Sequence, residues 1–203
     1  MNVERVPVPR MNADERRTQV LAAATRAFGR AGYAGTTTDM VAKQAGVSQP
    51  YVVRMFGTKR DLFLEVFDGA AARIMAAFRA VLEAGDFDPE SEEDWARMGE
   101  AYTDLLADHD FLQVLLHGFA AGDDEAIGAH ARQSMGEIFE ILHSTGCEPE
   151  VATAFVAHGM LLNVMMAMRA PQHLAEHPAL AGLTNCAFGE EGLARVTAGS
   201  PAP

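Results

Sequence analysis

The sequence predicts an all-α protein, because helical periodicity runs through nearly all of it. Apolar residues recur three and four positions apart, and no stretch shows a sustained two-residue alternation between hairpin turns. With 203 residues, of which 49% are hydrophobic, the chain can bury a core in one or two domains. Glycines, prolines and acidic loops then divide it into successive helices.

The first two helices are marked by their ends. The first is expected over residues 14–31, where Gly32 stops it. Its buried stripe consists of Leu21, Ala24, Phe28 and Ala31. A short second helix follows, because Thr37 can cap its first turn, Asp39 complements its dipole and Gly46 ends it.

A third short helix and a long fourth one come next. Ser48 can cap the third, and Pro50 falls in its first turn, where a missing N–H group has no partner to lose. From Lys59 an amphipathic helix is expected to run to about Leu82, before the acidic loop AGDFDPESEED. Its apolar face consists of Leu62, Phe63, Val66, Phe67, Ala70, Ile74, Ala77, Phe78 and Val81.

The remaining chain is expected to form further helices separated by loops such as GDD and STGCEPE. We expect them at residues 92–107, 110–120, 124–144, 149–169, 178–187 and 190–197. The final GSPAP should be frayed.

Charge is divided unevenly along the chain. The net charge is −12, which by itself argues against nucleic acid as a partner. Residues 1–60, however, carry ten basic against four acidic side chains, a net +6, and the rest carries six against twenty-four, a net −18. This asymmetry favours a small module that faces a polyanion, followed by an acidic body.

Two short helices joined by a tight glycine turn are typical of a helix-turn-helix, whose second helix enters the DNA major groove. Ala42 is small where the helices cross, and Gly46 follows at the position that needs a positive φ. The side chains expected to be buried between the helices are Val41, Ala45, Val47, Val52 and Met55. Those left facing outward are Ser48, Gln49, Pro50, Tyr51, Val53 and Arg54.

The outward side chains have the chemistry of DNA contacts. Gln49 can make a bidentate contact with adenine and Arg54 with guanine, while Pro50 and Val53 suit a thymine methyl group. The side chains placed for phosphates, which fix register without reading sequence, are Thr37, Tyr51 and Lys59. The alternative, a solvated face that contacts nothing, is disfavoured by the local positive charge.

The run TTTDMVAKQAGVSQPYVVRMFGTKRDLF, preceded by TQVLAAATRAFGRAGY, resembles the N-terminal DNA-binding domain of the TetR family of transcriptional regulators. The resemblance covers roughly residues 14–67. Tyr51 replaces a usually small hydroxyl residue, and Val53 and Met55 stand where the family commonly has aromatic residues or histidine. The resemblance implies a homodimer that binds double-stranded DNA and carries a pocket for a small-molecule effector.

We therefore expect four segments. They are a flexible N-terminal arm at residues 1–13, a helix-turn-helix DNA-binding domain at 14–60, a helical effector-binding and dimerisation domain at 61–198, and a flexible tail at 199–203. A disordered arm is the favoured reading, and the alternative is that Arg5 and Arg10 reach a minor groove.

Two features of the acidic body indicate where a second subunit and a small-molecule effector would bind. The segment PEVATAFVAHGMLLNVMMAM is apolar around most of its circumference, so a core or a second subunit must cover it, and we favour the subunit. The small residues that would allow close approach in this dimer interface are Ala154, Ala157 and Gly159. Large or adaptable side chains are candidates for the ligand pocket. They are Phe78, Trp95, Met98, Tyr102, Phe111, His117, Phe119, Met135, Phe139 and Met165.

No motif points to catalysis or to a cofactor. The sequence has no Gly-rich phosphate loop, nucleophile elbow or HExxH motif, so we expect no enzyme. His173 and His177 have ligand spacing, but no cysteine or carboxylate cluster accompanies them, and we expect no metal. The other histidines considered as ligands are His117, His143 and His158.

The sequence also favours a cytoplasmic location. Cys147 and Cys186 have no metal-type spacing and suit a reducing compartment. We expect no signal peptide and no segment approaching the ~18 uncharged apolar residues of a membrane span.

The function expected is that of a homodimeric repressor that leaves a pseudo-palindromic operator when a small, largely apolar molecule binds the body. Two alternatives within DNA binding are an activator and a regulator that responds to no ligand. From another class, the alternative is a small-molecule or metal-handling protein with a vestigial helix-turn-helix.

Overall fold

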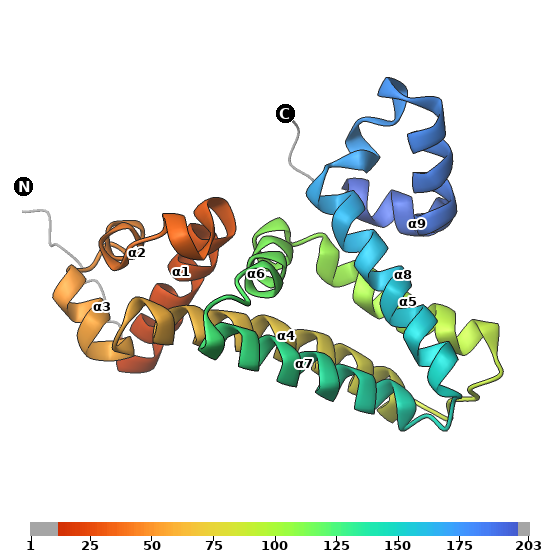
Figure 1. Cartoon of the computed structure of the whole chain (residues 1–203), viewed down its shortest axis with the longest axis horizontal. Helices are drawn as coiled ribbons and strands as arrows, with labels where there is room; N and C mark the ends of the chain where they lie inside the picture. Colours follow the sequence, from red (N-terminus) through yellow and green to blue (C-terminus); the bar gives the residue numbers. More distant parts are fainter. Residues whose placement is uncertain (1–11, 199–203) are drawn as a thin grey trace, which may run out of the picture.

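The computed structural model describes residues 12–198, and within them all regular structure is helical (Figure 1). The predicted all-α class is therefore confirmed. The helices are α1 (Ala13–Gly35), α2 (Thr38–Ala45), α3 (Gln49–Phe56), α4 (Lys59–Glu83), α5 (Glu92–Leu106), α6 (His109–Ala120), α7 (Glu125–His143), α8 (Pro149–Ala167), η1 (Ala170–Gln172), η2 (Leu174–Glu176) and α9 (Pro178–Ala198). The arm residues Arg5 and Arg10 and the tail 199–203 lie outside the described part.

Capping side chains set where the N-terminal helices begin. The Oγ1 of Thr37 accepts from the Met40 N–H at 3.2 Å, as expected. Ser48 occupies the cap position of α3, but its side chain makes no capping hydrogen bond, so that expectation was wrong. Two caps were not anticipated: Asn12 forms a capping box with Glu15, and Thr58 forms one with Asp61 at the start of α4.

Glycines end or bend the helices where the sequence placed them. Gly46 ends α2 with a φ of 66°. This left-handed backbone conformation is unfavourable for residues that have a Cβ atom. Gly32, with a φ of 68°, interrupts α1, although helical turns continue to Gly35. Gly189, with a φ of 64°, divides α9 at the point where two separate helices were expected.

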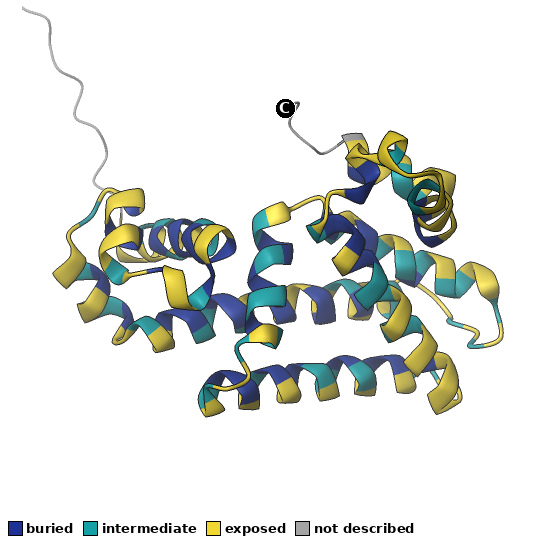
Figure 2. Cartoon of the chain, turned by 45° about the horizontal axis from the view of Figure 1, so that its top comes forward, coloured by how far each residue is buried: buried dark blue, intermediate teal, exposed yellow. Residues whose placement is uncertain are grey.

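The helices form two parts that share one hydrophobic core. In Figure 1, α1, α2 and α3 gather at one end, and α4 runs from this end through the body alongside α7. Helix α6 packs against α1, while α5, α8 and α9 cover the other side of the body. Figure 2 shows the buried residues as stripes on the helix faces that meet. An aromatic row joins the parts: the Phe28 and Phe63 ring centroids are 5.0 Å apart, and those of Phe67 and Phe119 are 5.8 Å apart.

Helix α8 corrects one expectation. Among the described residues it alone is long and apolar enough, by length and composition, to cross a membrane, although we expected no such segment. One helix of this kind is weak evidence for a membrane, because core and interface helices have the same composition. Helix α8 packs against α5, α6, α7 and α9, and Val151, Val164 and Met168 remain exposed.

Candidate DNA-binding surface and effector pocket

The helix-turn-helix is built as a small core with an exposed outer face. Val41, Ala45 and Val52 are buried between α2 and α3, as expected. Val47 and Met55 are only half-buried, because they lie at the edge of this small core. The exposed side chains around the start of α3 include Ser48, Gln49, Pro50, Val53 and Arg54.

Two contacts orient polar side chains on this face. The Nε2 of Gln49 donates to the Oγ1 of Thr38 at 3.2 Å, which ties the start of α3 to α2. The guanidinium of Arg54 lies 5.2 Å from the centroid of the Tyr51 ring. Tyr51 is half-buried, so its ring supports Arg54 instead of projecting freely.

The structure places Lys59 differently from the expectation of a phosphate contact. Its Nζ donates to the backbone carbonyl of Tyr33 at 3.0 Å and lies 4.4 Å from the centroid of the Tyr33 ring. The ammonium therefore connects α4 to α1. Arg16, which the sequence argument passed over, lines a hollow at the start of α1 with Ser48 and Tyr51. The sequence feature that could have identified Arg16 is its position as a basic side chain in the first turns of the first helix.

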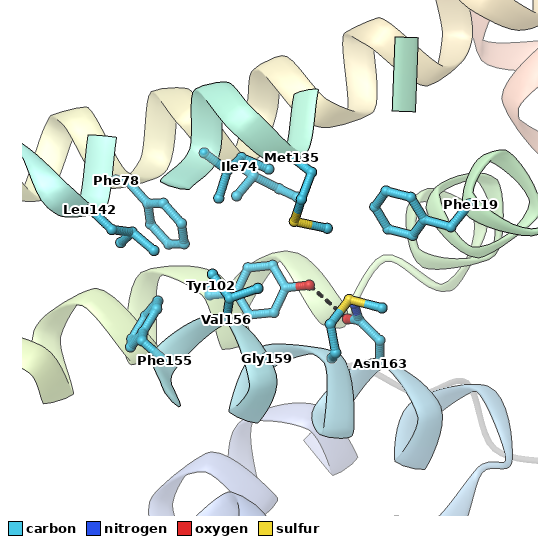
Figure 3. A pocket seen from close by; sticks show the side chains of 12 residues that line it. Ile74, Phe78, Tyr102, Phe119, Met135, Leu142, Phe155, Val156, Gly159 and Asn163 are labelled. Carbon is cyan, nitrogen blue, oxygen red and sulfur yellow. Dashed lines mark hydrogen bonds between the residues drawn. The ribbon is translucent and has the colours of Figure 1, made fainter. Parts of the chain in front are cut away.

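An apolar cavity, partly open to solvent, lies in the body and is lined by residues of α4, α5, α6, α7 and α8 (Figure 3). It holds about 40 Å³ of open space. Its lining residues are Ile74, Phe78, Tyr102, Phe119, Met135, Ile138, Leu142, Phe155, Val156, Gly159, Met160 and Asn163. None of these side chains carries a charge.

Four of the sequence candidates come together in this cavity: Phe78, Tyr102, Phe119 and Met135. The other six do not line it. Met98, Phe111 and Met165 are buried core residues, and Phe139 stacks on His143. Trp95 lies behind the wall, with its ring centroid 5.2 Å from that of Phe155. His117 faces α1.

Three of the wall residues that were missed share a sequence signal. On α8, Phe155, Gly159 and Asn163 follow one another at intervals of four and so lie on one helix face. Asn163 is moreover an amide within an otherwise apolar run, and it is only 1% exposed. A buried polar residue in such a run indicates either a hydrogen-bond partner or a ligand.

One polar pair interrupts the apolar lining. The Oη of Tyr102 donates to the Oδ1 of Asn163 at 2.7 Å, as the dashed line in Figure 3 marks. Burial raises the pKa of Tyr102 to about 12, and the hydrogen bond to Asn163 opposes this rise. The phenol is therefore uncharged at neutral pH.

Helix α6 connects the cavity to the first helix. Phe119 contributes to the cavity lining, and two residues earlier the Nε2 of His117 donates to the Gly29 carbonyl of α1 at 3.2 Å. The fit is close, because a Cβ on Gly32 would lie 3.2 Å from the His117 ring. Gly118 packs against the ring of Phe67 on α4, with which a Cβ at this position would clash.

The small residues of α8 face two directions. Ala154 and Ala157 are exposed. Gly159 was expected beside them in a dimer interface, but it faces inward, and a Cβ there would lie 3.2 Å from the Tyr102 ring. We therefore reassign Gly159 to the pocket wall.

The described residues contain no group of three or more His, Cys, Asp or Glu side chains that could hold a metal ion. Two of the histidines considered as ligands have other partners. The Nδ1 of His173 lies 2.8 Å from the Oε1 of Glu176, and the Nδ1 of His143 lies 3.1 Å from the Cys147 carbonyl oxygen.

Comparison with known proteins links the N-terminal part of the chain to transcriptional regulators. The family described as bacterial regulatory proteins, tetR family, matches residues 20–66. The HTH-type transcriptional activator FasR of Mycolicibacterium smegmatis is 36% identical over 73 residues, which are 36% of this chain. The matched segment spans only 33% of that activator's length.

Solved structures resemble the whole chain in fold. A TetR-like transcriptional regulator from Rhodococcus sp. RHA1 is 21% identical, with a TM-score of 0.63 over 94% of this chain and 100% of its own. The regulator FadR from Bacillus subtilis, solved in complex with stearoyl-CoA, is 16% identical, with a TM-score of 0.65 over 91% of this chain and 100% of its own. At these identities the likeness shows the shared architecture.

Proposed function

We propose that this chain, whose residues 20–66 match the TetR family of transcriptional regulators, is a ligand-responsive repressor of that family. In this proposal a homodimer in the cytoplasm occupies a pseudo-palindromic operator and leaves it when a small, largely apolar molecule enters the body. One observation carries the proposal: the cavity wall is continuous with the DNA-binding domain.

Two helices supply that continuity. Helix α4 begins directly after the helix-turn-helix at Lys59 and carries Ile74 and Phe78 of the cavity wall. Helix α6 carries Phe119 in the wall and His117 on α1. A change in cavity shape therefore reaches the DNA-binding domain through two packed elements, which is the physical requirement for coupling between distant sites.

The size of the cavity supports a change of shape on binding. About 40 Å³ of open space holds only a few water molecules, whereas ligand pockets commonly enclose some 300 Å³ or more. A ligand of ordinary size must therefore displace wall residues. The flexible side chains of Met135 and Met160 and the half-buried Phe119 are suited to move.

The DNA side of the proposal rests on charge and exposure. The basic N-terminal module presents Gln49, Val53 and Arg54 on the exposed face of α3, where a major groove can receive them. We assign base contacts to Gln49 and Arg54. Phosphate contacts are assigned to Arg16 and to the hydroxyls of Thr37, Ser48 and Tyr51, in place of Lys59.

Homodimerisation is supported by the free face of α8. Ala154, Ala157, Leu161, Val164 and Met168 recur three and four residues apart, as in a seam between two helices. All are exposed except Leu161, which is half-buried. A dimer would cover this face and would supply the two recognition helices, ~34 Å apart, that a pseudo-palindromic site needs.

An activator is the second candidate, because the curated relative FasR is an activator. A mobility-shift assay on genomic fragments next to the gene tests the DNA-binding claim, with binding to a discrete fragment expected. A reporter driven by that fragment, compared with and without the protein, then separates the two roles. Lower expression with the protein supports a repressor, and higher expression supports an activator.

A further inference from the structure

We infer that the cavity selects an uncharged ligand that offers one oxygen acceptor, a ketone, ether or ester, to the Tyr102–Asn163 pair. This inference rests on the proposed effector role of the cavity and names the chemistry that the effector must have. It is carried by the hydrogen-bond capacity that the pair leaves unused and by the absence of charge from the wall.

The pair has more donors than it has good acceptors. The Tyr102 hydroxyl donates to Oδ1 of Asn163, which leaves the Asn163 amide hydrogens for other partners. One of them reaches the sulfur of Met160, with Nδ2 and Sδ 3.7 Å apart. A thioether is a weak acceptor, so a ligand oxygen in its place would gain a stronger bond. Met160 is flexible and can yield this position.

The wall disfavours ionised ligands of either sign. No Asp, Glu, Lys, Arg or His lines the cavity, so a carboxylate or an ammonium group would lose its hydration without gaining an opposite charge. The raised pKa of Tyr102 keeps the phenol neutral, so it supplies no anion for a cation. The remaining lining is aliphatic, aromatic and thioether surface, which suits a hydrocarbon body.

Four probes that share a cyclohexyl ring separate these possibilities: cyclohexyl methyl ketone, ethylcyclohexane, cyclohexanecarboxylate and cyclohexylmethylammonium. Trp95, the only tryptophan of the chain, packs against Phe155 of the wall and reports binding by its fluorescence, with calorimetry as a second readout. The ketone should bind about fivefold more tightly than ethylcyclohexane, which is the value of one net hydrogen bond. Both ions should bind more weakly than either.

The double variant Tyr102→Phe/Asn163→Leu tests whether the pair is the cause. It removes both partners together, so neither is left buried without a bond and the fold should be kept. In this variant the preference for the ketone over ethylcyclohexane should vanish. The control Thr184→Val removes a buried hydroxyl of α9 that donates to Leu180, and the preference should survive there.

The inference fails if none of the probes binds, if either ion binds as tightly as the ketone, or if the preference persists in the double variant. Operator affinity is measured separately. Selective ketone binding that leaves operator affinity unchanged would overturn the proposed function and support the inference. Release of the operator by cyclohexyl methyl ketone that is equally strong in the wild type and the double variant would overturn the inference alone.

Discussion

The Nε2 of His117 donates to the carbonyl oxygen of Gly29 at 3.2 Å, and this bond joins α6 of the body to α1 of the DNA-binding domain. The two residues are 88 positions apart in the sequence. Since Phe119 lies two residues beyond His117 and lines the cavity, the bond is placed to carry a change in the cavity to the first helix.

The first prediction concerns this junction. Replacing His117 with alanine should reduce the effector's influence on operator affinity by ~1 kcal/mol and change affinity without effector by less than about threefold. Operator titrations with and without saturating effector measure both quantities. The control is His130→Ala, since His130 lies on α7 and pairs with Asp68 on α4 instead of with α1. Equal loss of coupling in both variants would argue against a special role for His117.

The second prediction concerns Phe78, which is buried in the cavity wall 5.7 Å, centroid to centroid, from Phe155. Phe78→Leu should enlarge the cavity, lower the free energy of unfolding by roughly 1–2 kcal/mol, and alter effector binding. Operator affinity without effector should change much less. If operator affinity fell while effector response stayed intact, α4 would have only a structural role.

The third prediction separates two residues of the N-terminal domain. Gln49→Ala should cost about 1–3 kcal/mol on the operator and little on random DNA, because a base contact is lost. Lys59→Ala should instead lower the free energy of unfolding by ~1 kcal/mol and leave the salt dependence of binding unchanged, since its ammonium binds the Tyr33 carbonyl.

Arg16→Ala provides the matched comparison for Lys59. It should reduce the slope of log affinity against log salt by about one per subunit, since one fewer counterion is released. Titrations at several salt concentrations on operator and scrambled duplexes measure all three variants. A reduced slope for Lys59→Ala would restore the phosphate contact originally expected for it.

The fourth prediction is a pH dependence. The pKa of Tyr102 rises from 10.0 to about 12 on folding, so its contribution to stability is complete below pH 10.0 and is lost as the pH rises toward 12. Tyr102→Phe should therefore show a shallower loss of stability over this interval. Denaturant unfolding of both proteins across this range measures it, and parallel pH profiles would contradict the assignment.

The fifth prediction concerns the exposed face of α8. Ala157→Arg should leave the protomer folded and destroy the dimer, because the residue is exposed in the protomer and lies within the proposed seam. Ala129→Arg, at an exposed position on α7, is the control and should remain dimeric. Sedimentation equilibrium reads the outcome. If the wild-type protein were monomeric at micromolar concentration, the proposed dimer would be contradicted.

Local signals were sufficient for the helices and for much of the helix-turn-helix. A residue such as Thr37 or Gly46 acts through its own backbone, so its effect can be seen in a few neighbouring letters. The cavity depends on the relative rotation of α4, α5, α6, α7 and α8, which no local pattern specifies. Sequence therefore found Phe78 and Tyr102 but not Asn163, and it placed Gly159 on the wrong face of its helix.

Lys59 illustrates the same limit within the DNA-binding domain. Its place at the start of α4 agreed with a phosphate contact, but its partner is a carbonyl that lies 26 residues earlier. Only the packing of α4 against α1 brings the two together.

The most direct test of the account measures operator affinity and cavity occupancy in the same sample. Labelled operator DNA reports the dissociation constant by anisotropy, while Trp95 fluorescence reports how much of the cavity is filled. The account predicts that full occupancy weakens operator binding by roughly 5- to 150-fold, the usual range of coupling between sites. An unchanged dissociation constant at full occupancy would contradict it.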